Sequence, residues 1–300
     1  MRIFGFESYG GPEVAGFLDV ADPDPASVPD GHVLISTTAS SVNPADIKVR
    51  SGARRGRFPV HFPMAMGREA SGTVLSADPV TGLEHGMTVF GSTATGTGAF
   101  AGRVLLDAVG ATPLPEGVTP EEAACIPVAA GTAWDILNEL RRDGLSTGGR
   151  VLVLGAGGGV GHCVVQLARA MDLRVTGVAG EDKRRFVEGL GATHVSSSGN
   201  WAVEVRDAGP VDAVVDLVGG GVLVEALTLT SGPVRSTADP AVGGGVTRRR
   251  SRAVFGELAG LVADGTFAPR ITAALPFDRA ADAVARVESG HAKGKTVLRL

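Results

Sequence analysis

The 300-residue sequence has only two cysteines, one tyrosine and few aromatic residues overall (5%). Two cysteines cannot form a disulfide framework, and because Cys125 and Cys163 lie in apolar segments we expect both to be buried as small hydrophobic residues. No run approaches the roughly 18 consecutive apolar residues of a membrane-spanning helix, and the N-terminus lacks the apolar core of a signal peptide. We therefore expect a cytoplasmic protein with no membrane partner.

An excess of positive charge is also missing, since the formal net charge is −4. This balance offers no general attraction to nucleic acid or to anionic membranes. The six histidines form no i, i+4 pair and no cluster at the spacing of metal ligands. What the sequence has in quantity is glycine (44 residues) and aliphatic side chains, which is typical of a turn-rich α/β protein.

The chain changes character near residue 120. Before it, short β-type runs alternate with Gly and Pro, at Val33–Thr38, Ala70–Ser76, Met87–Gly91 and Phe100–Leu106. Thr119 then starts a helix as an N-cap, with Pro and two acidic residues in the first turn. Further strands are expected at Ala213–Val218, near Val234 and at Lys295–Leu300, and helices at Val222–Leu229, Arg252–Asp264 and Asp278–Ser289.

A short apolar run, Val151 to Leu154, leads into a glycine cluster at 155–161. The following residues give one apolar face at helical spacing: Val160, Val164, Leu167, Ala168 and Met171. Glycines let the main chain approach a pyrophosphate, whose charge the free N–H groups of a helix N-terminus can bind. We predict a dinucleotide site formed by the loop residues Gly155, Gly157, Gly158, Gly159, Val160 and Gly161.

The loop does not match the G-x-G-x-x-G fingerprint in full. Counted back from Gly158 and Gly161, the first glycine position is occupied by Ala156, whereas Gly155, Gly158 and Gly161 recur at every third residue. A tight strand–helix turn without a ligand is therefore an alternative interpretation of the same residues.

The next β-type run, Arg174–Ala179, lacks the terminal carboxylate that binds the ribose 2′-hydroxyl in sites that prefer NAD. Gly180 stands there, and Lys183 and Arg184 follow it. Basic side chains can pair with the 2′-phosphate of NADP. The sequence thus favours NADPH over NADH, although an acidic pair lies between Gly180 and Lys183.

Several further segments match one family in the right order. They are Ser40–Gly52 (SSVNPADIKVRSG), Gly67–Val74 (GREASGTV), Gly98–Ala101 (GAFA), Pro115–Ala124 (PEGVTPEEAA), Gly131–Trp134 (GTAW), Leu190–Thr193 (LGAT), Asp216–Gly220 (DLVGG) and Gly294–Leu298 (GKTVL). With the glycine loop, they resemble the zinc-free quinone oxidoreductase-like branch of the medium-chain dehydrogenase/reductase superfamily, nearly end to end.

The resemblance implies an α/β fold in which a Rossmann doubly wound parallel sheet is inserted into a GroES-like β-rich domain. We expect the GroES-like domain at 1–120 plus 267–300 and the Rossmann domain at 121–266. Zinc-dependent relatives carry a ligand Cys where this chain has Asn43, and Gly-His-Glu where it has Gly67-Arg68-Glu69. Arginine cannot ligate a cation, so we expect no zinc. The expected cofactor is NADPH, with no flavin.

Without a Lewis acid, the expected reaction is hydride transfer to an activated acceptor, a quinone or an α,β-unsaturated carbonyl. The resemblance places Asn43 and Lys48 near the chemistry as catalytic candidates. Asn43 could equally cap the helix that follows it, and Lys48 could be a solvated lysine. Cofactor contacts are further expected from Thr132, Val218, Gly219 and Lys295.

The segment 229–252 departs from the family, because it is short and polar where relatives have two apolar strands that commonly pair across a dimer. Four arginines at 248–250 and 252 would protect an exposed strand edge. A homodimer therefore stays open. The same arginines motivate an RNA-binding alternative, which the negative net charge disfavours. A catalytically idle NADPH-binding sensor is the other alternative.

Overall fold

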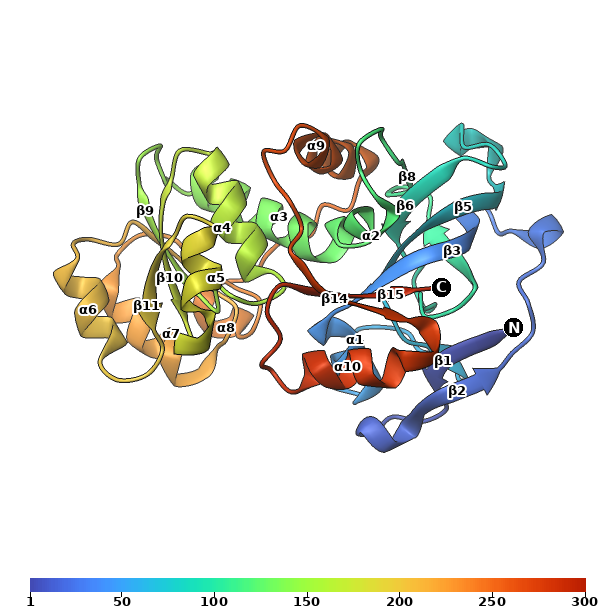
Figure 1. Cartoon of the computed structure of the whole chain (residues 1–300), viewed down its shortest axis with the longest axis horizontal. Coiled ribbons are helices and arrows are strands. Elements are labelled where there is room, and N and C mark those ends of the chain that lie inside the picture. The colour runs from blue at the N-terminus through green and yellow to red at the C-terminus, as the bar shows by residue number, and fades with distance from the viewer. The chain divides into compact units, whose positions relative to one another are not determined.

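The computed structural model describes all residues from Met1 to Leu300 and divides into two compact units (Figure 1). The first unit is assembled from three stretches of chain: Met1–Val128, Arg250–Asp264 and Ile271–Leu300. The second unit comprises Ala129–Arg249 and Gly265–Arg270. The predicted domain bounds, 1–120 plus 267–300 and 121–266, differ from these units mainly in placing the helix near residue 255 with the nucleotide-binding part.

The first unit is built around a seven-stranded sheet with a three-stranded sheet beside it in the same unit. The larger sheet has the order β14-β15-β3-β5-β6-β8, with β7 also paired to β3, and the smaller one has the order β2-β1-β4. Their strands are β1 (Arg2–Phe6), β2 (Ala15–Asp19), β3 (His32–Val42), β4 (Met64–Ala65), β5 (Glu69–Ala77), β6 (Thr88–Ser92), β7 (Arg103–Asp107), β8 (Thr112–Pro113), β14 (Ile271–Pro276) and β15 (Lys295–Arg299). Strand β15, from late in the chain, runs antiparallel to β3 and pairs Thr296 with Val42.

Four α-helices belong to the first unit: α1 (Pro44–Arg50), α2 (Pro120–Ala123), α9 (Arg252–Ala263) and α10 (Ala280–Glu288). Helix α2 starts as predicted, with Thr119 as N-cap and its hydroxyl accepting the N–H of Glu122. Helix α9 is held in this unit because Phe255 is fully buried against Phe90, with ring centroids 6.3 Å apart. Arg252 also donates to the carbonyls of Ala111 and Thr81. These contacts hold α9 in the first unit, whereas the predicted bounds assign this helix to the Rossmann domain.

The second unit is a parallel five-stranded sheet in the order β11-β10-β9-β12-β13. Its strands are β9 (Arg150–Leu154), β10 (Arg174–Ala179), β11 (Thr193–Ser196), β12 (Ala213–Asp216) and β13 (Val234–Ser236), and its helices are α3 (Gly131–Arg142), α4 (Gly161–Ala170), α5 (Arg184–Gly189), α6 (Trp201–Asp207), α7 (Gly220–Ala226) and α8 (Pro240–Gly243). Strands β10 and β11 lie to one side of β9, and strands β12 and β13 lie to the other. This is the Rossmann strand order without its sixth strand. The expected fold class is confirmed. No helix in the chain is both long enough and apolar enough to cross a bilayer.

The segment after α8 corrects one prediction. Residues 244–251 form no strand, so the arginines at 248–252 protect no strand edge. Arg248 instead forms an ion pair with Asp135 at 3.2 Å and donates to the hydroxyl of Thr132. The prediction failed because the carboxylate that anchors this arginine lies 113 residues earlier in the sequence.

Candidate functional site

The glycine loop joins β9 to α4 and has the backbone geometry of a phosphate-binding turn. Gly155 has φ +83°, which an L side chain rarely adopts, and a Cβ on Gly161 would lie 2.2 Å from the Gly155 carbonyl oxygen. The loop is anchored because the N–H groups of Gly155 and Ala156 both donate to Val178 O. The N–H groups of Gly157 and Gly159 make no hydrogen bond within the chain, so they are available to an anion.

The same end of the sheet carries a second turn, after β12. Strand order reverses between β9 and β12, and ligands of doubly wound sheets bind at such a point. Val218 is 53% exposed, and its Cγ2 lies 3.1 Å from where a Cβ on Gly155 would stand. The structure therefore brings the predicted residues Val218 and Gly219 beside the glycine loop.

Two polar residues to which the sequence analysis gave no role hold these turns in place. Asp216 is fully buried and accepts the N–H groups of Val218 (3.0 Å) and Gly219 (2.9 Å). His162 is also fully buried and bridges Gly158 O and the N–H of Arg270, with both contacts at 3.1 Å. Because Nε2 accepts from a main-chain N–H, Nδ1 carries the proton and donates to the loop. Both residues stood in segments already singled out, but only three-dimensional contacts reveal what they position.

The two basic residues predicted at the ribose end differ in their surroundings. Lys183 packs against the glycine loop, since its Cδ lies 2.7 Å from where a Cβ on Gly157 would stand. Arg184 forms ion pairs with Glu181 at 2.6 Å and Glu188 at 3.4 Å. The hydrogen bonds that Arg184 donates to the Glu181 carboxylate hold the pKa of Arg184 above its ordinary value. Lys183 thus lies against the glycine loop, and Arg184 is held by two carboxylate partners.

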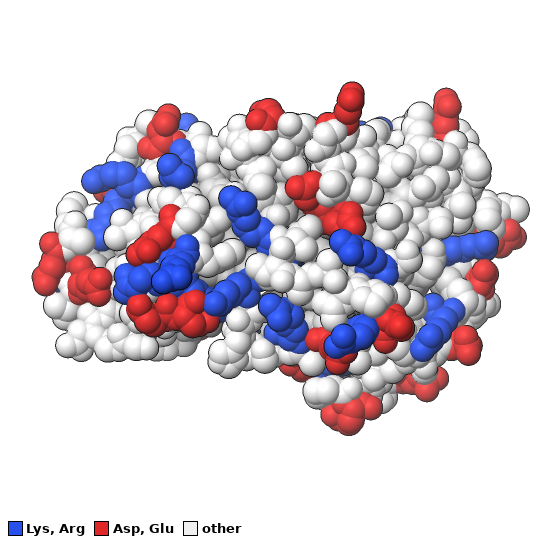
Figure 2. Space-filling model, in the orientation of Figure 1, with Lys and Arg blue, Asp and Glu red and all other residues white.

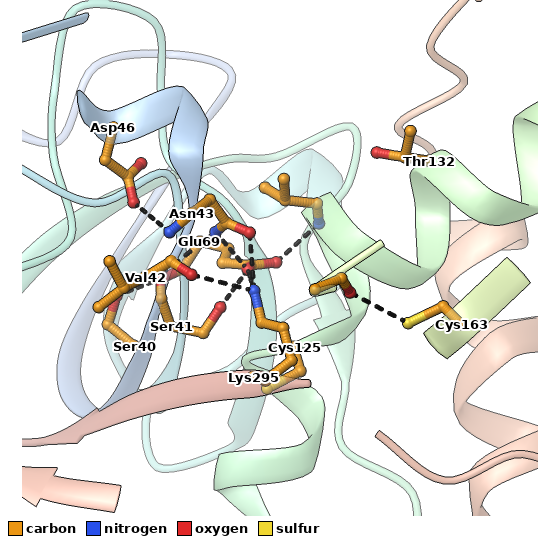
Figure 3. A network of polar contacts seen from close by, with 12 residues as sticks. Ser40, Ser41, Val42, Asn43, Asp46, Glu69, Cys125, Thr132, Cys163 and Lys295 are labelled. Carbon is orange, nitrogen blue, oxygen red and sulfur yellow. Dashed lines mark hydrogen bonds and ion pairs between the residues drawn. The ribbon is translucent and has the colours of Figure 1, made fainter. Parts of the chain in front are cut away.

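In the first unit, four polar side chains form a buried cluster (Figure 3). Glu69, at the start of β5, and Lys295, at the start of β15, are 0% and 1% exposed and lie 3.2 Å apart. The Asn43 amide connects them, because its Oδ1 accepts from Lys295 Nζ at 2.7 Å and its Nδ2 donates to Glu69 at 2.7 Å. The Ser41 hydroxyl and the Val128 N–H, the latter at 2.6 Å, also donate to the Glu69 carboxylate. Every strong acceptor and donor of the ion pair is therefore satisfied.

The cluster changes the interpretation of several predicted site residues. Asn43 is the N-cap residue of α1, but its amide is used by Glu69 and Lys295. Lys295, predicted to contact a cofactor, directs its ammonium at this buried carboxylate instead. Lys48 is exposed on α1 and does not join the cluster. Thr132, on α3 of the second unit, accepts a hydrogen bond from Arg248.

Next to Glu69 in sequence, Arg68 is 8% exposed, and its guanidinium carbon lies 3.8 Å from the ring centroid of Phe58. Burial lowers its pKa to about 10, against the opposing attraction of Asp46. Asp46, on α1, is 2% exposed, and burial raises its pKa to about 7 although the Asn43 N–H donates to its carboxylate. An arginine and a carboxyl group that is only partly ionised at neutral pH thus stand beside the cluster.

These residues do not fit a zinc ion. An ammonium group already occupies the space beside Asn43 and Glu69, and the side chain that follows Gly67 is a cation. The chain brings together no three His, Cys, Asp or Glu side chains suited to a metal. Cys125 and Cys163 are buried, as predicted, and form no disulfide, and burial raises the pKa of the Cys125 thiol to about 12.

Comparison with known proteins agrees with this architecture. Residues 29–116 match the family model of the alcohol dehydrogenase GroES-like domain, and residues 190–298 match a zinc-binding dehydrogenase domain. The bovine (Bos taurus) NAD(P)H oxidoreductase RTN4IP1, mitochondrial, is 30% identical over 99% of this chain and 89% of its own length. The chain belongs to the quinone oxidoreductase-like branch of the medium-chain dehydrogenase/reductase superfamily. As a member of that superfamily it is an oxidoreductase that uses a nicotinamide cofactor.

Other members of the superfamily are similar in sequence and in fold. A chloroplastic quinone-oxidoreductase homolog from Spinacia oleracea is 34% identical over 65% of this chain and 60% of its own length. The quinone oxidoreductase from Coxiella burnetii superposes with a TM-score of 0.88 at 25% identity, over 100% of this chain and 99% of that one. A mycobacterial protein solved with NADPH superposes with a TM-score of 0.84 at 25% identity over the full length of both chains.

Proposed function

We propose that this oxidoreductase transfers hydride from NADPH to a quinone or an α,β-unsaturated carbonyl compound without a metal ion. The observation that carries the proposal is the combination of a dinucleotide-binding glycine loop with a buried ammonium beside Asn43 and Glu69. A metal-free site suits acceptors that are already electrophilic, because they need no Lewis acid. The names of the relatives from spinach and Coxiella support a quinone as one acceptor.

The second unit supplies the groups that would hold NADPH. The N–H groups of Gly157 and Gly159 would bind the pyrophosphate, and the turn at Val218 and Gly219 would flank the cofactor at the switch point. Lys183 would pair with the 2′-phosphate, which supports NADPH over NADH. When bound, the nicotinamide supplies the hydride, and the chain's task is to orient it and to exclude water.

An assay of purified, chelator-treated protein tests the proposal. Oxidation of NADPH and of NADH is followed with a benzoquinone, a naphthoquinone, an alkenal, a cyclic enone and a simple ketone. We expect turnover of quinones or enones with NADPH, unaffected by the chelator, and none of the ketone. Tight NADPH binding without any turnover would contradict the proposed activity and support the idle sensor. A loss of turnover on chelation would show that a metal is needed.

The RNA-binding alternative has little support in the described contacts. Arg248 is paired with Asp135, and Arg252 donates to two carbonyl oxygens. On the face shown in Figure 2, basic and acidic side chains are intermixed rather than gathered by sign. The cytoplasmic location and the homodimer stay predictions, and the bovine relative's name gives a mitochondrial location for that protein.

A further inference from the structure

Arg68 is buried without a hydrogen bond or an ion pair for its guanidinium group. It is 8% exposed, yet its side chain makes no hydrogen bond and no ion pair within the chain, and Nη1 is sealed from solvent without an acceptor. Arginine is almost never buried to this degree unless it is paired. Its one close contact is the Phe58 ring, 3.8 Å from the guanidinium carbon, which orients the planar group but satisfies none of its N–H donors.

The one anion that acts on Arg68 is the Asp46 carboxyl, and it forms no ion pair with the guanidinium. Burial lowers the pKa of Arg68, the attraction of Asp46 opposes this, and the charges of Arg250 and Arg54 lower the pKa further. Because burial raises the pKa of Asp46 to about 7, that carboxyl is only partly ionised at neutral pH. The five N–H donors of the rigid guanidinium plane have no acceptor within the chain, so they can receive an anionic oxygen.

The main chain fixes where Arg68 stands. Glu69 begins β5, and its side chain accepts hydrogen bonds within the buried cluster. Because successive residues of an extended chain direct their side chains to opposite sides, the Arg68 side chain is directed to the other side of the strand. The Arg68 carbonyl accepts the Thr93 N–H at 3.0 Å. A Cβ on the preceding residue, Gly67, would lie 2.6 Å from the Phe100 ring, so the chain cannot shift easily at this point. The receptor is therefore preorganised.

We propose that Arg68 is a catalytic residue that donates hydrogen bonds to the acceptor's carbonyl oxygen as hydride arrives. This inference rests on the proposed function. Hydride adds to the electrophilic carbon of the quinone or enone, the electron pair of the double bond moves to the oxygen, and Arg68 stabilises the resulting oxyanion. Water then supplies the proton that completes the two-electron reduction. A fixed cation does for this oxygen what a metal ion does in the zinc-dependent relatives, from the position where they carry a His.

Steady-state kinetics of Arg68→Gln, Arg68→Lys and Arg55→Gln test the proposal. Arg55 is the matched control, because it also lies over an aromatic ring, that of Tyr9 at 5.5 Å, but is exposed. We expect Arg68→Gln to lower kcat by about 10²–10³ with unchanged NADPH affinity, as for the loss of an oxyanion donor. The kcat of Arg68→Lys should lie between those of Arg68→Gln and the parent, and the kcat of Arg55→Gln should equal that of the parent. A kcat of Arg68→Gln within about threefold of the parent, or a change in KM alone, would overturn the proposal.

A binding measurement separates this inference from the proposed activity. 4-Nitrophenol serves as an oxyanion probe, and its ionisation in the complex with NADP⁺ is read from the visible absorbance of the phenolate. We expect the parent and Arg55→Gln to bind the phenolate form and lower the apparent pKa of the probe, and Arg68→Gln to lose this effect. Equal phenolate binding by Arg68→Gln would refute the role of Arg68. If the parent binds the phenolate but reduces no acceptor, the proposed activity fails while the anion site stands.

Discussion

Removing the buried ammonium of Lys295 tests the structure of the cluster most directly. Lys295→Met keeps a side chain of similar length but leaves the Glu69 carboxylate, 0% exposed, without its counter-ion at 3.2 Å. Breaking one partner of a buried ion pair costs about 3–5 kcal/mol. Donors from Ser41, Asn43 and the Val128 N–H stay with the carboxylate, so we expect a loss near the lower limit, about 3 kcal/mol.

The double variant Glu69→Gln/Lys295→Met gives the decisive comparison. It removes both charges, and replacing a buried pair by neutral groups of similar volume is often close to neutral. We therefore expect the double variant to be more stable than Lys295→Met by about 2 kcal/mol, which a double-mutant cycle measures.

Urea unfolding at neutral pH, followed by far-ultraviolet circular dichroism, is the appropriate assay. Both tryptophans, Trp134 and Trp201, lie in the second unit, so their fluorescence reports that unit alone and serves as an internal control. We expect the dichroism midpoint of Lys295→Met to fall while the fluorescence midpoint moves less. A loss under about 1 kcal/mol, or a double variant no more stable than the single one, would refute the buried ion pair.

Three further variants test the raised pKa of Asp46, the glycine loop at Gly161 and the proposed contact of Lys183 with the 2′-phosphate. Asp46 has a folded pKa of about 7 against an ordinary 3.8, so the folded chain binds more protons there and stability falls as pH rises between these values. Asp46→Asn should abolish this fall, so above pH 7 its free energy of unfolding should exceed that of the parent by as much as about 4 kcal/mol. Urea unfolding at several pH values measures this difference. Gly161→Ala should abolish NADPH binding in a fluorescence titration, because its Cβ would lie 2.2 Å from Gly155 O, whereas Gly189→Ala meets nothing within 4 Å and should bind normally. Lys183→Gln should weaken NADPH binding about tenfold and leave NADH binding unchanged in the same titration. Equal losses for both cofactors would show that Lys183 does not contact the 2′-phosphate.

The dinucleotide loop could be predicted from the sequence because its determinants are local. A strand, a glycine cluster and an amphipathic helix follow one another within about 20 residues, and each enforces its own geometry. Val218 and Gly219 could be added because parallel strands present their carboxyl ends at one edge. The structure places Val218 beside Gly155, and the role of these residues in cofactor binding stays a prediction.

The buried cluster could not be predicted in the same way. Glu69 and Lys295 are 226 residues apart, and nothing near either residue reveals that the other lies beside it. A lysine before an apolar run is usually an exposed strand end, yet Lys295, predicted as a cofactor contact, is 1% exposed. Lys48, predicted as a catalytic candidate, is the exposed one of the two. Arg68 was recognised only as a side chain that cannot bind zinc. Its lack of a partner is a property of the packing around it.

The ion pair between Glu69 and Lys295 also sets an order for the synthesis of this protein. At about 5–20 residues per second, the ribosome adds Lys295 roughly 10–45 s after Glu69. During that interval β3 and β5 exist without β15, and the carboxylate destined for the interior has no counter-ion. The second unit's sheet comes from a continuous stretch between these residues and is complete earlier. Chains halted before β15 would therefore carry a protease-resistant second unit beside a protease-sensitive first one.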